Sequence, residues 1–514
     1  MEHDRPNCTR SVRIIVAMPH HAPFDIDATT GREGAAVASP RPSAESAWAD
    51  GPSLEPLDAT AGRRIEQPGR GLISLVKRRP FDALFGVLVL ALAGFRIGRT
   101  VATPIAIWND SLDYIKLAKQ PWISTAFWIG PRPPMAAVLW KLTSTPARFT
   151  VTQTVISVLA WSFLAFTVMK LLRPGWRSLV GPGLVLAFAT TWPITLWDSL
   201  VLSESISLSA LAVITACVLR LSRRWSRSAA GGLILASVVY VGARDADVWT
   251  VALIGVAMIV YGTIRWLRTR ARQTRRVLVV ATALLATASL AEVAALSTGR
   301  NVQNVEHVFA VRVLPYPDRV AWFAAHGMPM QKAIEDLART TPRSHDSAAI
   351  VWPNINSKTW APLARYFATN SESDYTLFLV THPGYDLSTP FDSPQLGFNF
   401  GSGDLGIYGS GVGHLPYVSS FLFPAWGVAL AMGVFGAALL VARRRRRREA
   451  LAVVFLAGVG VVSMLVAWHG DAEEFVRHIL EGNIQARVAA LLLLVMGAVG
   501  LAPGSADRAA AATP

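Results

Sequence analysis

The chain has 514 residues, of which 52% are hydrophobic and only 16% are charged, and its mean hydropathy is +0.37. A soluble protein carries about 25% charged residues, so this composition excludes an ordinary soluble enzyme. The net charge is +15, but the basic residues gather in short links between apolar runs, which indicates membrane topology and argues against nucleic acid as a partner.

The N-terminal part of the chain differs from the rest. Residues 1–75 are rich in Pro, Ala, Ser, Asp and Arg and have no hydrophobic periodicity, which predicts a disordered tail. The apolar piece at 14–18 is too short for a signal peptide, so we expect the first membrane span to direct insertion. Residues 504–514 are expected to form a second disordered tail.

About ten apolar runs follow, most of them close to the roughly 20 residues that a bilayer span requires. They lie approximately at 81–98, 149–172, 178–196, 201–221, 229–243, 246–264, 277–297, 418–441, 450–468 and 487–503. Some runs are short or interrupted, so we expect about 9–12 transmembrane helices. The sequence therefore predicts an all-α polytopic membrane protein, with an N-terminal bundle over residues 76–297 and C-terminal membrane helices over 418–503.

Short basic links give the orientation of these spans. Clusters of Lys and Arg lie at residues 77–79, 220–227, 265–276 and 443–448, and with alternating spans all of them fall on one side. Short loops rich in Lys and Arg stay in the cytoplasm. We therefore expect both termini in the cytoplasm, with the plasma membrane as the simplest location.

The alternation places two larger segments outside. The first outer loop covers residues 99–148, and the second segment covers 298–417. The second segment has 8 Lys/Arg and 10 Asp/Glu, so it lacks the basic excess of the cytoplasmic links. We expect an extracytoplasmic loop domain with a helix near 357–366 and otherwise irregular loops. Cys8 and Cys217 predict neither a disulfide nor a metal cluster.

The first outer loop carries the acidic sequence Trp-Asn-Asp-Ser-Leu-Asp-Tyr, in which Asp110 and Asp113 would share one face of a helix. A carboxylate at the membrane surface can act as a general base toward a sugar or protein hydroxyl, with an effect of about 10²–10⁴ on the rate. The same residues also fit a capping box, with negative charge at a helix start. The two roles are compatible.

Two arginines on the same side could bind an anion. Arg132 precedes two prolines and a helical run at 135–142, so it would lie near a helix N-terminus, a position that suits phosphate. The alternative is an anchor at the membrane interface. Arg244 could also bind phosphate, or it could form a local ion pair with Asp245 or Asp247.

Glu204 and the link before the last span complete the candidate site. Glu204 begins a span, where an ionisable residue is usually paired or functional, although Ser203 and Glu204 also fit a helix cap. The link before the last span carries Arg477 and His478, and Arg487 starts that span; these side chains could contact a phosphate donor or simply form a solvated link. The histidine spacing in the link matches no metal signature, so no metal site is assigned and a divalent cation stays an open question.

These segments resemble the GT-C superfamily of integral-membrane glycosyltransferases, which use polyprenyl-phosphate sugars. The superfamily includes protein mannosyltransferases, lipid A aminoarabinose transferases and mycobacterial arabinosyl- and mannosyltransferases. The resemblance covers about residues 80–503 and lies in Asp110, Asp113 and Tyr114, in Gly-Pro-Arg-Pro-Pro at 130–134, in Leu-Ser-Glu-Ser at 202–205, and in the acids, arginine and histidine at 471–478. Many members have adjacent acids in the first outer loop, whereas two residues separate the acids here, so the resemblance leaves open which is the base.

The resemblance implies a GT-C-like helical bundle that transfers a sugar from a polyprenyl-phosphate donor to a glycan, lipid or protein acceptor among membrane lipids. It implies Asp110 as the catalytic base, with Arg132 and Arg244 on the lipid phosphate and Glu204 and His478 beside them. These side chains are then expected to converge on one outer cavity. A transporter or flippase of lipid-linked glycans is one alternative and predicts ionisable residues at mid-membrane. A non-catalytic membrane scaffold is another.

Overall fold

The computed structural model describes residues 14–16, 80–172, 174–269, 272–330, 332, 335, 357–392, 422–442, 447–470, 472 and 475–500. Most of the predicted N-terminal tail and the whole of the C-terminal tail therefore lie outside the described residues. Within residues 1–75 only strand β1 (Ile14–Val16) is described, and it pairs in parallel with β2 (Ile105–Ile107). Contacts divide the chain into a unit of residues 1–17 and 84–514 and a unit of residues 18–83, of which only the first turn of α2 is described.

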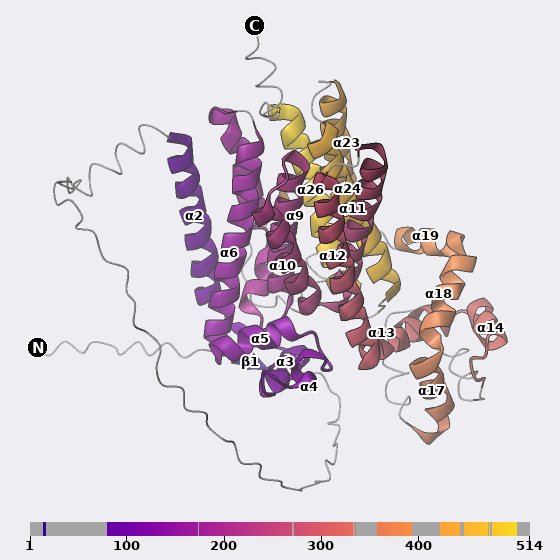
Figure 1. Ribbon diagram of the computed structural model, residues 1–514. Coiled ribbons are helices and arrows are strands. Elements are labelled where there is room, and N and C mark those ends of the chain that lie inside the picture. The colour runs from indigo at the N-terminus through magenta and orange to yellow at the C-terminus, as the bar shows by residue number, and fades with distance from the viewer. Residues whose placement is uncertain are drawn as a thin grey trace, which may run out of the picture. The chain divides into compact units, whose positions relative to one another are not determined.

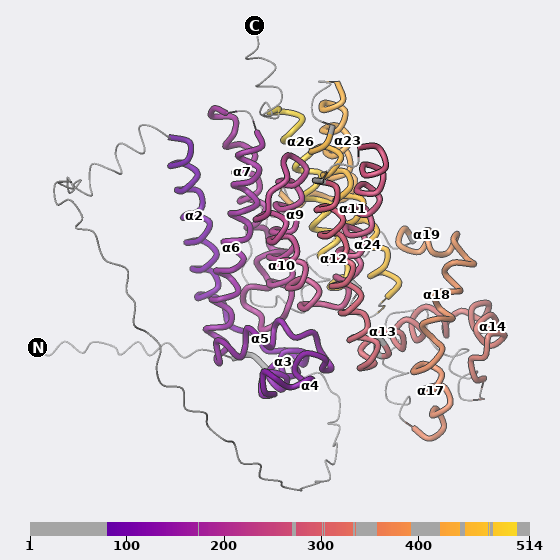
Figure 2. The backbone as a smooth tube through the Cα atoms, in the orientation of Figure 1, coloured from indigo at the N-terminus to yellow at the C-terminus, as the bar shows by residue number. Residues whose placement is uncertain are grey.

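Long helices make up most of the described chain (Figures 1 and 2). They are α2 (Pro80–Ala102), α6 (Pro146–Leu171), α9 (Glu204–Arg223), α10 (Arg227–Ala243), α11 (Val248–Thr269), α12 (Arg272–Ser297), α23 (Trp426–Ala442), α24 (Arg447–Gly470) and α26 (Leu480–Val499). Short helices lie between them: α3 (Asn109–Ala118), α4 (Thr125–Trp128), α5 (Pro134–Thr143), η1 (Trp176–Leu179), α7 (Val180–Phe188), α8 (Trp192–Thr195), η2 (Leu196–Ser199), η3 (Asp245–Asp247) and α25 (Phe475–His478).

Seven helices in the described part of the chain are long and apolar enough to cross a membrane. The count becomes eight if the bent pair Trp176–Phe188 and Trp192–Ser199, which turns by 56°, is one span. The break falls just before Pro193, in the first turn of α8, because proline cannot donate the backbone hydrogen bond of a continuing helix. Two more apolar helices, α10 and α23, have 17 residues each. The structure confirms an all-α polytopic membrane protein.

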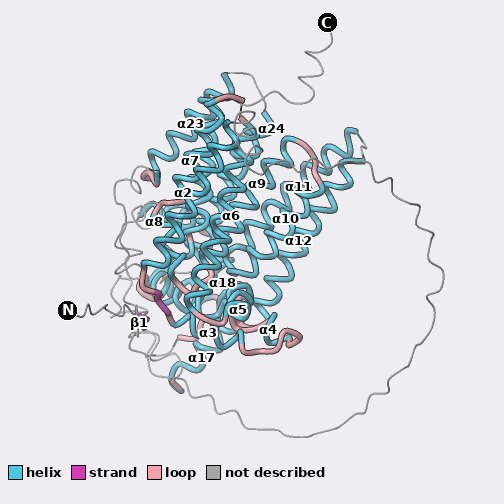
Figure 3. Tube along the Cα trace, turned by 90° about the vertical axis from the view of Figure 1, so that its left-hand side faces the viewer, coloured by secondary structure: helices cyan, strands magenta, loops and turns pink. Residues whose placement is uncertain are grey.

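The long helices run side by side in the views of Figures 1 and 3. Helix α9 packs against α6 and α10, α11 against α12, and α26 against both α23 and α24. The contact of α24 with α26 is close because glycines face each other. A Cβ added to Gly482 would lie 2.5 Å from the carbonyl oxygen of Gly460. Small residues of this kind let membrane helices approach, where lipid supplies little hydrophobic drive for association.

The helix ends sort into two groups. The start of α9, the end of α10 and the start of α26 lie at the same end as α3 and α5, because side chains from these segments are in direct contact. The opposite ends of α9 and α10 adjoin the basic link 220–227. The link 265–276 joins the end of α11 to the start of α12, and because α11 starts just after Arg244, this link lies at the opposite end as well. The starts of α2 and α24, next to the other two basic clusters, lie at that opposite end too (Figure 1). The basic links and the α3–α5 segment are thus at opposite ends of the bundle.

A second group of helices follows α12. It comprises α13 (Arg300–Val308), η4 (Phe309–Val313), α14 (Pro317–Ala325), η6 (Lys358–Trp360), α17 (Ala361–Thr369), α18 (Ser371–Thr381) and α19 (Pro383–Asp392). The predicted helix near 357–366 corresponds to η6 and α17, whereas the expectation of otherwise irregular loops is wrong for the described part of 298–417. Aromatic side chains at helical spacing explain the difference, because they bury a separate apolar cluster around Phe309, Phe323 and Phe378.

Candidate functional site

A row of side chains with alternating positive and negative charges connects the α3–α5 segment with the membrane helices. In the first turn of α3, Asp110 accepts hydrogen bonds from Arg132 through Oδ1 at 2.6 Å and from Arg477 through Oδ2 at 2.7 Å. Arg132 also contacts Asp113, with Nε and Nη2 both 3.3 Å from Oδ2. Both oxygens of Asp110 are therefore occupied by guanidinium groups from different segments.

Arg477 extends this row of charged side chains into the bundle. Its Nε donates to Oε1 of Glu204, and Nη1 of Arg244 lies 3.8 Å from the same oxygen. The same nitrogen of Arg244 donates to Oε1 of Glu481 at 2.6 Å and to the backbone carbonyl of Arg477 at 3.0 Å. We call this set of side chains the charge network: Asp113, Arg132, Asp110, Arg477, Glu204, Arg244 and Glu481.

The charge network runs from the surface to the interior. The side chain of Asp113 is 37% exposed and that of Asp110 is 19% exposed, whereas Arg477 is 7% exposed and Glu204 is fully buried. A buried charge is stable only when it is paired, and every inner member of the network has an opposite partner. A ligand that arrives from the surface meets Asp113, Arg132 and Asp110 before it reaches Arg477 and Glu204.

The local structure of α3 leaves Asp110 available for these contacts. The hydroxyl of Ser111 accepts a hydrogen bond from the backbone N–H of Trp108 at 2.9 Å and closes the first turn. The capping box predicted for Asp110 and Asp113 is therefore wrong, because the serine between them takes that part. The predicted cap by Ser203 is also absent, since Ser203 accepts a hydrogen bond from Tyr114 at 3.2 Å and so joins α9 to α3.

The prolines act on Arg132 as predicted. Helix α5 begins at Pro134, with proline in its first turn, where the missing N–H costs nothing. Arg132 precedes this turn and directs its guanidinium to Asp110 and Asp113. These contacts place Arg132 in the charge network and do not support the alternative of an anchor at the membrane interface.

Arg244 does not form the local ion pair that was the alternative for it. Asp245 pairs instead with Arg300 at 2.9 Å, and Asp247 accepts a hydrogen bond from Ser207 at 2.5 Å. Arg244 is left to bridge Glu204 and Glu481 on two other helices. It therefore joins the inner half of the network.

The arginines dominate the electrostatics of Asp110. Burial raises the pKa of this carboxyl, but the charges of Arg477 and Arg132 outweigh burial and lower the pKa from 3.8 to about 2. Burial lowers the pKa of Arg132, yet the facing carboxylate of Asp110 brings the net shift upward. The pKa of Tyr114 rises to about 12, through burial first and the charge of Asp110 second. Asp110 is thus a carboxylate, and Tyr114 a neutral phenol, at neutral pH.

Of the predicted site residues near the C-terminus, Arg477 belongs to the charge network and His478 follows it in the sequence. His478 is half-buried next to Arg477, and its charge contributes to the low pKa of Asp110. Asp471, Glu473 and Glu474 lie outside the described residues.

Arg487 does not join the network. It lies inside α26, where its guanidinium is 4.3 Å from the ring centre of Phe423. The expectation that it starts the last span is wrong because α26 begins at Leu480, and the same early start puts the unpredicted Glu481 into the network. Apolar residues four apart at Leu480, Ile484 and Val488 were the signal for this earlier helix start.

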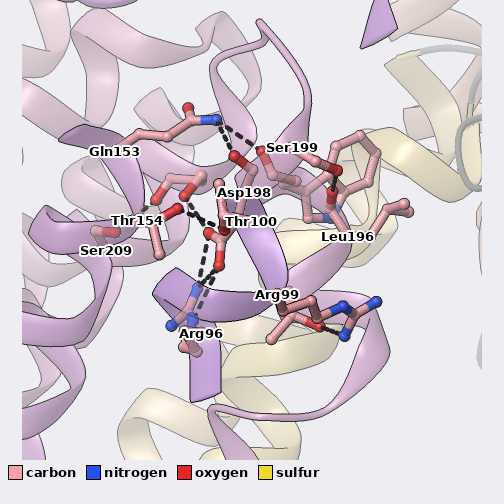
Figure 4. A network of polar contacts seen from close by, with 12 residues as sticks. Arg96, Arg99, Thr100, Gln153, Thr154, Leu196, Asp198, Ser199 and Ser209 are labelled. Carbon is pink, nitrogen blue, oxygen red and sulfur yellow. Dashed lines mark hydrogen bonds and ion pairs between the residues drawn. The ribbon is translucent and has the colours of Figure 1, made fainter. Parts of the chain in front are cut away.

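A second buried network was not predicted, and Figure 4 shows it. Arg96 of α2 binds Asp198 of η2 through two nitrogens, with Nε 2.9 Å from Oδ2 and Nη2 2.8 Å from Oδ1. Ser205 donates to the same carboxylate at 2.9 Å. The side-chain amide of Gln153 donates to three backbone carbonyls of the segment that contains Asp198. This network fixes the second half of the bent pair to α2 and α6.

Within the part of the chain that the structure describes, no group of three or more His, Cys, Asp and Glu side chains is arranged to hold a metal ion. No protein-family model matches the chain, and no curated protein matches it either. The resemblance to the GT-C superfamily stays a prediction from the motifs.

Proposed function

We propose that the protein is a membrane glycosyltransferase of GT-C type. It transfers a sugar from a polyprenyl-phosphate donor to a glycan, lipid or protein acceptor on the outer face of the plasma membrane. One observation carries this proposal: Asp110, Arg132, Glu204, Arg244 and Arg477 come from separate segments and meet at one end of the bundle. A carboxylate between two guanidiniums offers both a base and an anion site in one place.

The proposed orientation rests on the basic links. They adjoin the end of the bundle opposite the charge network, and short basic loops stay in the cytoplasm. The network then faces the outer leaflet, both termini are cytoplasmic, and residues 298–417 form an extracytoplasmic domain. In this topology α10, α23 and the bent pair join the seven longer helices as spans, which gives ten.

The chemistry follows from the order of the charges. The acceptor hydroxyl gives its proton to Asp110 as its oxygen bonds to the anomeric carbon of the donor sugar. The bond from that carbon to the phosphate oxygen breaks, and polyprenyl phosphate leaves with the electron pair. Arg132 and Arg477 balance the charge of the leaving phosphate. The carboxylate of Asp113 stabilises an oxocarbenium-like transition state electrostatically, by analogy with glycoside hydrolysis.

Arg244 has a positioning role in this proposal. It pairs with the buried carboxylates of Glu204 and Glu481 and donates to the carbonyl of Arg477. Arg477, by contrast, reaches the partly exposed Asp110, so Arg244 holds Arg477 in place and does not touch the phosphate. Glu204 acts in the same way from the other side of Arg477.

The test uses the purified full-length protein in nanodiscs with a panel of polyprenyl-phosphate hexoses and pentoses and an envelope extract as acceptor. Release of polyprenyl phosphate reports turnover. We expect the wild type to consume at least one donor and Asp110→Asn to lower turnover about 10²–10⁴-fold. The matched control Asp318→Asn removes one negative charge from an exposed site on α14 (Pro317–Ala325) outside the network, and it should retain the activity of the wild type. Absence of turnover with every donor would contradict the proposal.

A transporter or flippase is the second candidate, and a specific observation favours it. The bent pair and the buried ion pair of Arg96 with Asp198 are features that transporters use at substrate pathways. However, Arg96 is only six residues from the end of α2, which is about 9 Å at the rise of an α-helix, so the pair lies away from mid-membrane. Translocation of a fluorescent lipid-linked glycan in proteoliposomes, unaffected by Asp110→Asn, would favour this candidate.

A further inference from the structure

The contacts of Asp110 in the charge network do not fit a simple role as general base. The two guanidiniums that would bind a phosphate are already bound to the carboxylate that would act as base. Asp110 gives one oxygen to Arg132 at 2.6 Å and the other to Arg477 at 2.7 Å. A carboxylate held in this way has little affinity for a proton, because protonation would break charge-assisted hydrogen bonds on both sides.

Both guanidiniums have a second carboxylate that holds them without Asp110. Arg132 also contacts Asp113, and Arg477 also donates to Glu204. If Asp110 turned away, neither arginine would lose its position. An anion that took the place of Asp110 would leave the alternation of charge in the network intact, so no buried charge would become unpaired.

Of the two carboxylates that bind Arg477, Asp110 is the one that an incoming anion can displace more easily. It lies in the first turn of α3, its side chain is 19% exposed, and the cap of that turn depends on Ser111 instead. The inner carboxylates Glu204 and Glu481 are fully or almost fully buried. An incoming anion therefore competes with Asp110 before it meets any other carboxylate that binds Arg477.

We propose that the donor phosphate displaces Asp110 from Arg132 and Arg477, and that this exchange is what makes Asp110 competent as a base. The inference rests on the proposed function and adds its regulation. Before the donor binds, Asp110 is locked and the acceptor hydroxyl is not activated. After the exchange, the phosphate occupies the guanidiniums and the freed carboxylate faces the acceptor. The exchange itself moves no proton at neutral pH, and the donor must bind before the acceptor reacts.

The first test measures binding without any sugar transfer. The ligand is a short-chain prenyl methyl phosphodiester, which carries a single negative charge, and the protein is the full chain in nanodiscs. Asp110→Asn removes the competing carboxylate, so we expect it to bind this ligand about tenfold more tightly, equivalent to about 1.4 kcal/mol. Asp318→Asn is the matched control, because it removes one negative charge from an exposed site on α14 outside the network.

The outcomes separate this inference from the proposed function. If the wild type binds the diester and Asp110→Asn binds it equally or less tightly, the exchange is refuted and the proposed function stands. If the wild type does not bind the diester at all, the proposed function itself fails. Inorganic phosphate is the comparison ligand, and binding as tight as that of the diester would assign the site to free phosphate and overturn the lipid donor.

A second measurement uses only the wild type, in case the variant does not fold. The exchange should return the pKa of Asp110 from about 2 toward its ordinary value of 3.8. At pH 4 the diester should then bind with uptake of about 0.4 proton, measured by calorimetry in buffers of different ionisation enthalpy. Binding without proton uptake at this pH would overturn the exchange.

Discussion

Replacement of Asp110 by asparagine should show how strongly the charge network stabilises the fold. The pKa of this carboxyl falls from 3.8 to about 2, because Arg477 and Arg132 outweigh the opposing effect of burial. At about 1.4 kcal/mol per pH unit, the ionised carboxylate contributes roughly 2 kcal/mol to stability at neutral pH. Asp110→Asn keeps the size of the side chain but removes this contribution.

The direction of the pKa shift predicts how the stability difference between the wild type and Asp110→Asn depends on pH. A carboxyl whose pKa is lower in the folded state stabilises the fold above its ordinary pKa and loses this effect as the pH falls through the folded value. The difference in unfolding free energy between the wild type and Asp110→Asn should therefore be constant from about pH 8 to pH 5. It should shrink between about pH 4 and pH 2. Denaturant unfolding in detergent micelles measures it, with Asp318→Asn as the control for loss of one surface charge. A difference below about 0.5 kcal/mol at pH 7, or one that grows toward acid pH, would refute the reasoning.

Three further predictions concern stability. Glu204→Gln removes the carboxylate that the buried Arg244 and Arg477 share and should lower the free energy of unfolding by about 3–5 kcal/mol. An unchanged melting temperature would show that the inner part of the charge network does not stabilise the fold. Gly482→Ala places a Cβ 2.5 Å from a backbone oxygen of α24 and should lower the free energy of unfolding by about 1–3 kcal/mol. Gly458→Ala, which has open space around it, should leave stability unchanged, and equal effects of the two variants would contradict the packing of α24 against α26. Tyr114→Phe and Ser203→Ala should each lower the free energy of unfolding by about 1 kcal/mol. The double variant should lose little more, because the same hydrogen bond is lost in all three variants. Additive losses would show that the two hydroxyl groups act separately.

The membrane helices were predictable because the bilayer itself imposes the pattern. Each predicted apolar run overlaps a long helix or the bent pair, whatever the helix later packs against. Boundaries were less predictable where a local feature decides them. The break before Pro193 and the early start of α26 at Leu480 both depend on a few residues inside an apolar stretch.

The sequence predicted the members of the charge network except Glu481, but it did not predict which of them pair. Alternation of spans places Asp110 and Arg477 at the same end of the bundle, yet 367 residues separate them in the sequence, and only the folded structure brings Arg477 of α25 to Asp110 of α3. The pairing of Arg96 with Asp198 was missed for a related reason. Hydropathy averages over a window and hides a single charge, although an arginine inside an apolar run is itself a sign that a buried partner exists.

The most direct test of the central claim is a comparison of envelope glycans and glycolipids by mass spectrometry. The strains compared are the parent, a deletion strain, and the deletion strain complemented with the wild type or with Asp110→Asn. We expect the deletion to remove a specific sugar from one class of envelope molecules. The wild type should restore this sugar and Asp110→Asn should not, although the variant is present in the membrane. Envelope glycans that are the same in all four strains would show that the protein is not a glycosyltransferase of the envelope.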